Sequence, residues 1–568
     1  MLVSAEWSFV DDGGYYRKQE IYSMKWTGID ISTSKVAVAC YGGPIAVAND
    51  NGGFQKSFTI FIYTSAGQTM GKIAWNNGEL VGMYWSASEE LICVRRDGRI
   101  FLYSMFGISV SISGDQLDEG TFTMGNEAQE LKIINCTTFT CYSSTTGIAV
   151  LTGAGRFYLV NNIHRPKVWR SAEMTWPAGV HPKSTCWTVY STERSTNVLS
   201  CFDNGDIYRF SNTDAPEQLF HVFETPVKLY RHIAVSPNAE NVALISENGL
   251  VQMTSIDFKT RLCETDSGLR RNPTAFCFCG SRAVICYQDS QSLQLSLIGV
   301  QGGTVEFPVD GPVVISRELD GIRILSAEAN EFLSEVPEPM VAVFSIGSVA
   351  PGSLLVESYS EFVRESSKAA EYVGMLDGPS MDSAVEQCLD AACRSALDPK
   401  LQRTLLSAAS FGKSFRPEMT ALRDKFVSVC RILRVLNAVR APHVGIPVSF
   451  EQLEDLTVAV LVDRLINRRQ WPLAVCICDW LKIKPEAGRN RVMLSWALMK
   501  IESRTMTDDE TARLIHDKLA FSASNGQQHS PPYADLAQVA ARCGRKQLAL
   551  KASKTPLSTS LIIRKLRT

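Results

Sequence analysis

Along the chain up to about residue 349, short apolar segments alternate with turn sequences. The segments are rich in β-branched and aromatic residues, and each consists of a strand-like run, a tight turn and a second run. Three of the turns carry Asp97-Gly98, Asn204-Gly205 or Asn248-Gly249, which supply the positive φ that two-residue hairpins need. The segments are "KVAVACYGG" (35–43), "ELICVRRDGRIFLYSM" (90–105), "GIAVLTGAGRFYLVNN" (147–162), "NVLSCFDNGDIYRFSN" (197–212), "NVALISENGLVQMTSI" (241–256) and "RAVICYQDSQSLQLSLIG" (282–299).

The spacing of the turns is typical of a β-propeller. The turns centred near residues 98, 154, 205, 249 and 290 lie roughly 40–57 residues apart, and four-stranded propeller blades repeat at about 40–50 residues. A pair of stacked β-sandwiches is the alternative, but the spacing is sustained and no long linker interrupts it. We therefore predict an N-terminal seven-bladed-type β-propeller over residues 1–349.

After "VAPGSLL" (349–355) the apolar positions follow the period of about 3.6 that is typical of helices. Two predicted helix starts have the spacing of a capping box, Ser449 with Gln452 and Thr507 with Glu510. Short loops between helices predict an α-solenoid of antiparallel helix pairs over residues 350–553, which leaves a tail at 554–568 without a predicted helix. The predicted helices span residues 353–376, 381–393, 399–412, 418–440, 450–470, 472–483, 489–503, 508–519, 533–542 and 545–553.

The stretch "VCRILRVLNAVRAPHVGIPVSFEQL" (429–453) places arginines among aliphatic residues. The polar positions Ser428, Arg431, Arg434, Asn437 and Arg440 recur every three residues, so on a helix of about 100° per residue they wind around the axis and form no single basic face. The positions between them are apolar nearly all round, which is typical of a helix packed between neighbours. We interpret the stretch as structural. Binding to an acidic protein surface is a less favoured alternative, and binding to nucleic acid is the least favoured.

The composition indicates packed domains. The chain has 568 residues, 45% of them hydrophobic and 20% charged, so two or more domains are expected. Its formal net charge of -2 does not favour a binder of nucleic acid or of a membrane surface. The 16 scattered cysteines predict reduced, buried thiols of a cytosolic protein. We expect no signal peptide and no membrane-spanning segment, so that any membrane work is done through partners.

Two short motifs imitate nucleotide-binding loops. In "SFGKSF" (410–415), Gly412-Lys413-Ser414 resembles the end of a phosphate-binding loop, but Ser407 stands where the pattern needs glycine and the preceding residues are helical. "GAGRFY" (153–158) lacks the third glycine and the following helix of a dinucleotide loop. We interpret the first as the C-terminal end of a helix and the second as a hairpin turn.

Metal and acid–base sites are not predicted. The pairs Cys277 with Cys279 and Cys476 with Cys478 have no second pair or histidine at zinc spacing, so buried thiols are expected. The histidines are dispersed at positions 164, 181, 221, 232, 443, 516 and 529. We predict no catalytic, cofactor-binding or metal-ligating residues and no cofactor. An enzyme with a site in the propeller channel is the least favoured function, and the sequence assigns no partner-binding residues.

Collinear segments carry a resemblance that reaches from residue 15 to about 550. In order they resemble the vacuolar protein sorting-associated protein 16 family. They are "YYRKQEIYSMKW" (15–26), "YGGPIAV" (41–47), "ELDGIRILSAEANEFLSEVP" (318–337), "APGSLLVES" (350–358), "LLSAASFGKSF" (405–415), "RILRVLNAVRAPHVGIPVSF" (431–450) and "RLINRRQWPLAVCICDWL" (464–481).

The resemblance implies a scaffold subunit, without catalytic activity, of the membrane tethers HOPS and CORVET. These tethers act in endosome-to-vacuole or lysosome traffic and in SNARE-mediated fusion. The implied partners are the other core subunits, the SM-family protein vacuolar protein sorting-associated protein 33 and, indirectly, SNAREs, with no nucleic acid and no direct membrane insertion. The implied location is cytoplasmic, peripherally on late-endosomal and vacuolar or lysosomal membranes.

Two further expectations follow from the resemblance. Family members continue as a solenoid beyond "CGRKQLAL" (543–550), and their dock for the SM partner lies in that continuation, so we expect weak SM binding from the 568-residue chain. A vesicle-coat or intraflagellar-transport component of the same architecture is the alternative function, which the segment matches disfavour.

Overall fold

The computed structural model describes most of the chain. The described residues are 3–11, 14–26, 28–49, 57–110, 120–172, 183–212, 214–220, 222–223, 225–269, 272–289, 294–395, 397–418, 420–503, 506–524 and 533–553. The predicted turn near residue 290, the tail at 554–568 and the histidines at positions 181, 221 and 529 lie outside them.

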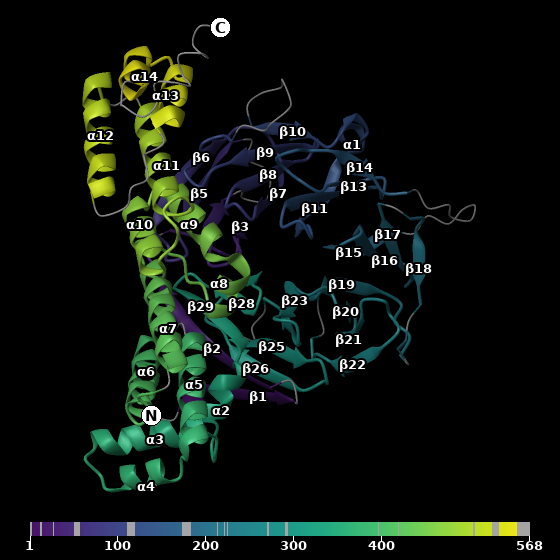
Figure 1. Ribbon diagram of the computed structural model, residues 1–568. Coiled ribbons are helices and arrows are strands. Elements are labelled where there is room, and N and C mark those ends of the chain that lie inside the picture. Colours follow the sequence, from purple (N-terminus) through teal and green to yellow (C-terminus); the bar gives the residue numbers. More distant parts are fainter. Residues whose placement is uncertain are drawn as a thin grey trace. The chain divides into compact units, whose positions relative to one another are not determined.

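Within these residues the first two thirds of the chain form seven antiparallel sheets (Figure 1). Three consecutive four-stranded sheets contain β3 (Lys35–Val38), β4 (Ile45–Ala48), β5 (Phe58–Tyr63) and β6 (Thr69–Trp75); β7 (Leu80–Trp85), β8 (Leu91–Arg95), β9 (Arg99–Tyr103) and β10 (Thr121–Thr123); and β11 (Ile133–Thr140), β12 (Thr146–Thr152), β13 (Phe157–Val160) and β14 (Val168–Arg170). The next three contain β15 (Ser184–Ser191), β16 (Thr196–Phe202), β17 (Ile207–Ser211) and β18 (Glu217–Leu219); β19 (Tyr230–Val235), β20 (Asn241–Ser246), β21 (Leu250–Ser255) and β22 (Arg261–Asp266); and β23 (Ala275–Cys279), β24 (Ala283–Tyr287), β25 (Gln294–Gly299) and β26 (Thr304–Pro308).

The remaining sheet closes the ring. Its strand order is β1 (Ser8–Asp11), β2 (Gly14–Ser23), β29 (Ala329–Glu335), β28 (Gly321–Leu325) and β27 (Val314–Arg317), so N-terminal strands pair with the last strands of the region. The first strands of successive blades, from β3 to β27, contact one another around the ring. The predicted seven-bladed propeller is confirmed, and the sandwich alternative is wrong.

The propeller core lies between neighbouring blades. The alternating pattern buries one face of each strand against the next sheet, as in the cluster that joins Ile60 and Trp75 of the first blade to Leu91 and Cys93 of the second. Central strands are covered on both faces and are apolar throughout, such as β4 with the sequence IAVA, in which every residue is buried. The apolar runs from which the strands were predicted therefore form the hydrophobic core between the blades.

The hairpin turns differ in type from the prediction. In each of the three Asp-Gly or Asn-Gly turns the glycine alone has positive φ: Gly98 at 83°, Gly205 at 88° and Gly249 at 84°. Each donates its backbone N–H to the residue three positions earlier, as Gly98 does to the carbonyl of Arg95 at 3.0 Å. The loops are thus three-residue connections with glycine in the left-handed position, and the predicted two-residue turns are wrong.

Helices follow the propeller, and two predicted helices are each divided. Residues 353–376 form α3 and α4 with a break at Glu365, whose φ is 57°, and residues 450–470 form α8 and α9 with a break at Thr457, whose φ is 67°. The predicted capping boxes are confirmed. The helices after the propeller, as described, are α2 (Glu338–Phe344), α3 (Pro351–Val363), α4 (Lys368–Gly374), α5 (Gly378–Arg394), α6 (Pro399–Ser414), α7 (Thr420–Val439), α8 (Phe450–Leu456), α9 (Val458–Asn467), α10 (Trp471–Trp480), α11 (Arg489–Glu502), α12 (Asp508–Ser524), α13 (Tyr533–Arg542) and α14 (Lys546–Ser553); α1 (Asn126–Leu131) and a 3-10 helix (Val3–Glu6) belong to the propeller region.

The chain divides into two compact units. The first comprises residues 1–423 with 439–452, and the second comprises residues 424–438 with 453–568. In the first unit α5 packs against α6 and α3; in the second, α10 packs against α11, and α13 against α14. The described helices include none that is both long and apolar enough to cross a membrane.

Candidate interaction site

A buried ion pair joins the closing blade to the first blade. Arg323 on β28 lies 2.7 Å from Glu318, measured from Nε to Oε1, and each side chain is 1% exposed. Glu318 also accepts the backbone N–H of Tyr41 at 2.6 Å and that of Gly42 at 3.4 Å. Burial raises the pKa of Glu318, and the charge of Arg323 and these two N–H groups oppose the shift.

Arg323 continues this network into the first blade. Its guanidinium donates to the carbonyl of Ala39 and, at 2.9 Å, to the hydroxyl of Ser65. Asn330 on β29 donates to the carbonyl of Ser65 at 2.8 Å. The seam of the ring is therefore held by an ion pair and by hydrogen bonds to both buried charged groups.

A segment far along the chain returns to this seam. We call Val439–Gln452 the return segment. The hydroxyl of Tyr22 donates to the carbonyl of Arg440 at 2.6 Å, and residues 444–449 are buried. A Cβ on Gly42 would lie 2.6 Å from Cδ of Pro447, and one on Gly445 would lie 2.8 Å from Cβ of Thr64. Both contacts require glycine, so the fit is close.

The return segment also starts α8 against the propeller. Ser449 and Gln452 exchange backbone-to-side-chain hydrogen bonds at 3.3 and 3.1 Å. Gln452 then donates its side-chain amide to Oδ1 of Asp320 at 2.7 Å. The capping box that the sequence predicts thus also places an amide on the loop between β27 and β28.

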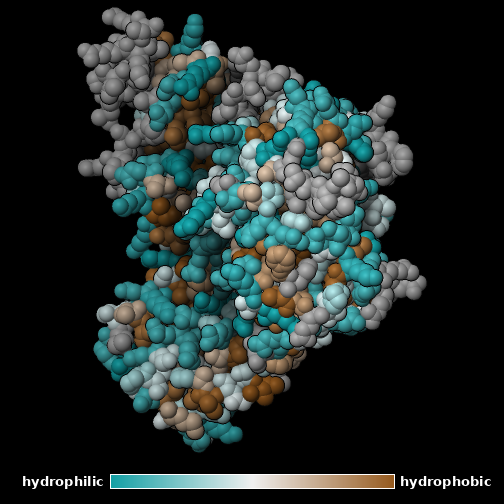
Figure 2. All heavy atoms as spheres, turned by 90° about the vertical axis from the view of Figure 1, so that its right-hand side faces the viewer, coloured by the Kyte–Doolittle hydropathy of each residue, from teal (hydrophilic) through white to brown (hydrophobic). Residues whose placement is uncertain are grey.

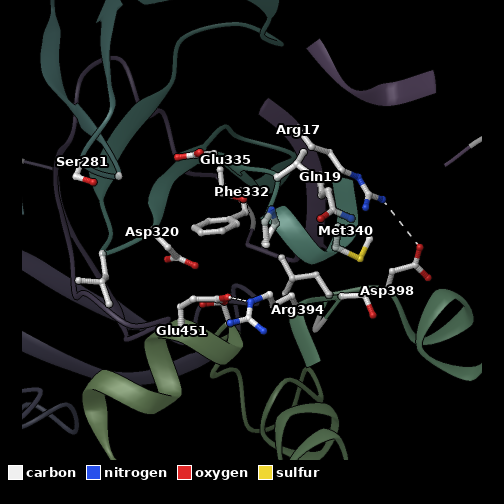
Figure 3. Close-up of a pocket in the computed structure, with 18 residues that line it drawn as sticks. Arg17, Gln19, Ser281, Asp320, Phe332, Glu335, Met340, Arg394, Asp398 and Glu451 are labelled. Carbon is white, nitrogen blue, oxygen red and sulfur yellow. Dashed lines mark ion pairs between the residues drawn. The ribbon is translucent and has the colours of Figure 1, made fainter. Parts of the chain in front are cut away.

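Next to this contact lies a cavity of about 400 Å³ within the first unit. Its walls are the strands β2 and β29, helix α2, the connection from α5 to α6, and the start of α8 (Figure 3). The lining residues are Arg17, Gln19, Gly280, Ser281, Leu319, Asp320, Phe332, Ser334, Glu335, Val336, Pro337, Met340, Arg394, Ser395, Leu397, Asp398, Ser449 and Glu451.

Ion pairs border the cavity. Arg394 lies 3.1 Å from Glu451, and Arg17 lies 3.9 Å from Asp398 (Figure 3). Glu335 lies 3.1 Å from Arg282 outside the cavity. Burial raises the pKa of Glu335, which the charge of Arg282 opposes.

Asp320 differs from the other carboxyl groups in its partners. Burial raises its pKa, and hydrogen bonds from Ser449 and Gln452, which are neutral, oppose the shift. The described residues contain no group of three or more histidines, cysteines, aspartates or glutamates placed to hold a metal ion.

One face of the outer surface has mixed hydropathy. On the face that Figure 2 turns to the viewer, apolar side chains lie in small groups between polar ones. Sequence reasoning missed the cavity because its walls come from segments more than 400 residues apart. The available signal was the run "HVGIPVSF" (443–450), which is too apolar for an exposed connection between helices.

The motifs that imitate nucleotide loops occupy structural positions. Gly412 is buried within α6, and a Cβ there would lie 2.8 Å from Leu355 and Val385, so the glycine serves helix packing. The helix continues to Ser414, two residues past the predicted end. "GAGRFY" (153–158) connects β12 to β13 with Gly155 at φ 76°, so the predicted hairpin turn is confirmed.

The cysteine pairs are only partly buried. Cys279 and Cys478 are buried, Cys277 is half-buried, and Cys476 on α10 is exposed. The prediction of buried thiols is therefore wrong for Cys476. Neighbours two apart on a helix point in different directions, which places one of the pair outward.

The arginines of the stretch 429–453 lie in different surroundings. Arg434 on α7 stacks over the ring of Trp480 in the second unit, with 5.5 Å between the guanidinium carbon and the ring centroid. Arg440 follows the end of α7 and lies in the first unit, where burial lowers the pKa of its guanidinium. This separation agrees with the structural interpretation of the stretch.

The fold defines a class of protein: a closed β-propeller followed by packed helices. Sequence comparison identifies the family within this class. The sequence model of "Vps16, N-terminal region" matches residues 3–427, and the chain belongs to this family.

Curated relatives agree with this family. "Protein VACUOLELESS1" of Arabidopsis thaliana is 31% identical over 99% of this chain and 65% of its own length. The "Vacuolar protein sorting-associated protein 16 homolog" of Drosophila melanogaster is 29% identical over the same shares, and that of Dictyostelium discoideum is 28% identical over 97% and 63%. The chain thus spans just under two thirds of the length of these relatives.

Solved propellers match at a greater distance. The β-propeller domain of Cps50 (Swd1) from Myceliophteria thermophila is 11% identical, with a TM-score of 0.36, over 55% of this chain and 99% of that chain. This likeness adds nothing to the fold already described.

Proposed function

We propose that the chain is a scaffold subunit of a multisubunit membrane tether of the HOPS or CORVET type. In this role it serves endosome-to-vacuole or lysosome traffic, and it binds proteins without catalysing a reaction. The observation that carries the proposal is the match to vacuolar sorting proteins along 99% of the chain.

The proposed partners are the other core subunits of the tether and, through them, SNAREs. We further propose a peripheral position on late-endosomal and vacuolar membranes, reached through these partners. The propeller at 1–349 and the solenoid at 350–553 are proposed as its two working parts. The dispersed charge and the recessed cavity support binding to proteins rather than to a nucleic acid.

Affinity purification tests the proposal. The chain is tagged in its own cells at native expression, and the recovered proteins are identified by quantitative mass spectrometry. We expect the core subunits of a vacuolar tether in near-equal amounts. Recovery of vesicle-coat or intraflagellar-transport subunits in their place would overturn the proposal.

Depletion provides a second measurement. Loss of the protein is expected to fragment the vacuole or lysosome and to delay delivery of an endocytosed marker, because fusion then lacks its tether. Unchanged organelle morphology together with unchanged delivery would count against the proposal.

A further inference from the structure

The cavity beside the closing blade contains one carboxylate, that of Asp320, whose side-chain hydrogen-bond partners are neutral. Among the residues that the structure describes, Asp320 accepts from the side-chain amide of Gln452 at 2.7 Å and from Ser449, and no lysine or arginine lies within ion-pair distance of it. The other acidic residues of the lining, Glu335, Glu451 and Asp398, each pair with an arginine. A recessed carboxyl group that is not paired with a cation is the feature that a cationic ligand would complete.

The remaining walls suit the stem of a long side chain. Phe332, Met340 and Leu397 line the same cavity, and Figure 3 draws the Phe332 ring and the Asp320 carboxylate toward one space. The volume of about 400 Å³ exceeds that of one long side chain, which leaves room for bridging waters. An aromatic face beside a carboxylate favours a guanidinium over an ammonium, because the planar group can stack and donate at once.

We propose that this cavity binds an arginine side chain presented by an extended segment of a partner protein. In that complex Asp320 accepts the guanidinium hydrogen bonds and the ring of Phe332 provides the stacking surface. The inference rests on the proposed function, in which the chain acts by binding other proteins, and it adds the chemistry of one binding site. All of the lining belongs to the first compact unit, so the site is complete within it.

The first test uses the purified chain and a small probe. N-acetyl-arginine-N-methylamide is titrated and followed by saturation-transfer NMR, beside its citrulline counterpart, which has the same shape without the charge. For one side chain we expect a dissociation constant on the order of millimolar for the arginine probe and at least about tenfold weaker binding of the citrulline probe. Equal binding of the two probes would overturn the inference.

Variants locate the binding. Asp320→Asn preserves the shape of the side chain and an acceptor for Gln452, so the variant should fold. Its affinity for the arginine probe should be at least about tenfold lower than that of the wild type. Glu371→Gln, which neutralises an exposed carboxylate on α4 outside the cavity, is the matched control and should bind as the wild type does. Undiminished binding of the arginine probe to a folded Asp320→Asn chain would contradict the inference.

A second test separates this inference from the proposed function. The tagged chain and its Asp320→Asn variant are purified from cells, and cross-linked peptides at the cavity are sequenced. We expect the wild type to capture an arginine-containing segment of one partner and the variant to lose it while other partners remain. Equal capture by both would overturn the arginine site but leave the tether role intact. Recovery of no tether subunit by either chain would overturn the role, while the probe titration still decides the site.

Discussion

Glu318 and Arg323 lie at the ring seam with their side chains 1% exposed, although transferring a charge out of water is costly. The cost is offset in part because Glu318 accepts from backbone N–H groups, and Arg323 donates to the carbonyl of Ala39 and to the hydroxyl of Ser65. Removing one partner would leave the other buried and uncompensated.

Arg323→Met should therefore lower the free energy of unfolding by about 3–5 kcal/mol, the range for breaking a buried pair from one side. The double variant Glu318→Gln with Arg323→Met should recover at least about 1 kcal/mol of this loss, since it removes the orphaned charge. Urea denaturation followed by tryptophan fluorescence measures both. A double variant that is less stable than the single one would contradict this account of the pair.

Asp320 provides a dependence of stability on pH. Its pKa is raised in the folded chain, so between the unfolded and folded pKa values the folded state binds more protons, and stability falls as the pH rises through that window. Asp320→Asn removes the titration. The melting temperature of the variant minus that of the wild type should therefore increase from pH 4.5 to pH 7.5, as measured by differential scanning fluorimetry. A difference that is constant or decreases over this range would exclude the assigned cause.

At the scale of elements, local patterns predicted local structure. The hairpins and most helices have periods and turn residues that act within about ten positions, and they were predicted. The breaks at Glu365 and Thr457 were not, because non-glycine residues there take positive φ under tertiary packing that no local signal encodes. The short α2 was missed for the same reason: seven residues carry too little periodicity.

The return segment shows the same limit for the candidate site. Its apolar run was visible, but the surface that buries it is built from residues 22, 42 and 64. A single sequence does not show that the return segment lies close to these three residues in space. The capping box was predicted for its local role, whereas its contact with Asp320 could be seen only in the folded chain.

Gly42 tests whether the return segment is held by close packing. At φ 65° with Pro447 at 2.6 Å from an added Cβ, Gly42→Ala suffers both backbone strain and a clash. Gly78→Ala is the matched control, because Gly78 has φ 88° and nothing within 4 Å, so only strain applies. We expect a cost of about 1–2 kcal/mol for Gly78→Ala and at least about 1 kcal/mol more for Gly42→Ala.

The measurement is urea denaturation together with hydrogen exchange of the return segment. Faster exchange at the amides of residues 444–446 and 448 in Gly42→Ala alone is expected, since the clash displaces that segment. Equal stabilities and equal exchange in the two variants would show that the Pro447 contact does not matter.

For the whole molecule, ring closure depends on the N-terminal strands. β2 pairs with β29 along its length, from Tyr16 with Glu335 to Ser23 with Ala329, and Tyr22 also contacts the return segment. Deleting residues 1–23 would leave β29 as an open edge and remove both attachments at once. Deleting residues 1–7 removes the 3-10 helix and leaves both strands, and is the control.

The longer deletion should reduce hydrogen-exchange protection in β28 and β29 by at least about a hundredfold, because these strands would open without global unfolding. Protection in β3–β6 should fall as well, since Ala39 and Ser65 lose their fixed partners Arg323 and Asn330 across the seam. The shorter deletion should leave both regions as in the full chain. Native protection of the first blade after the longer deletion would mean that each blade is stable alone, and that closure adds little to the stability of the ring.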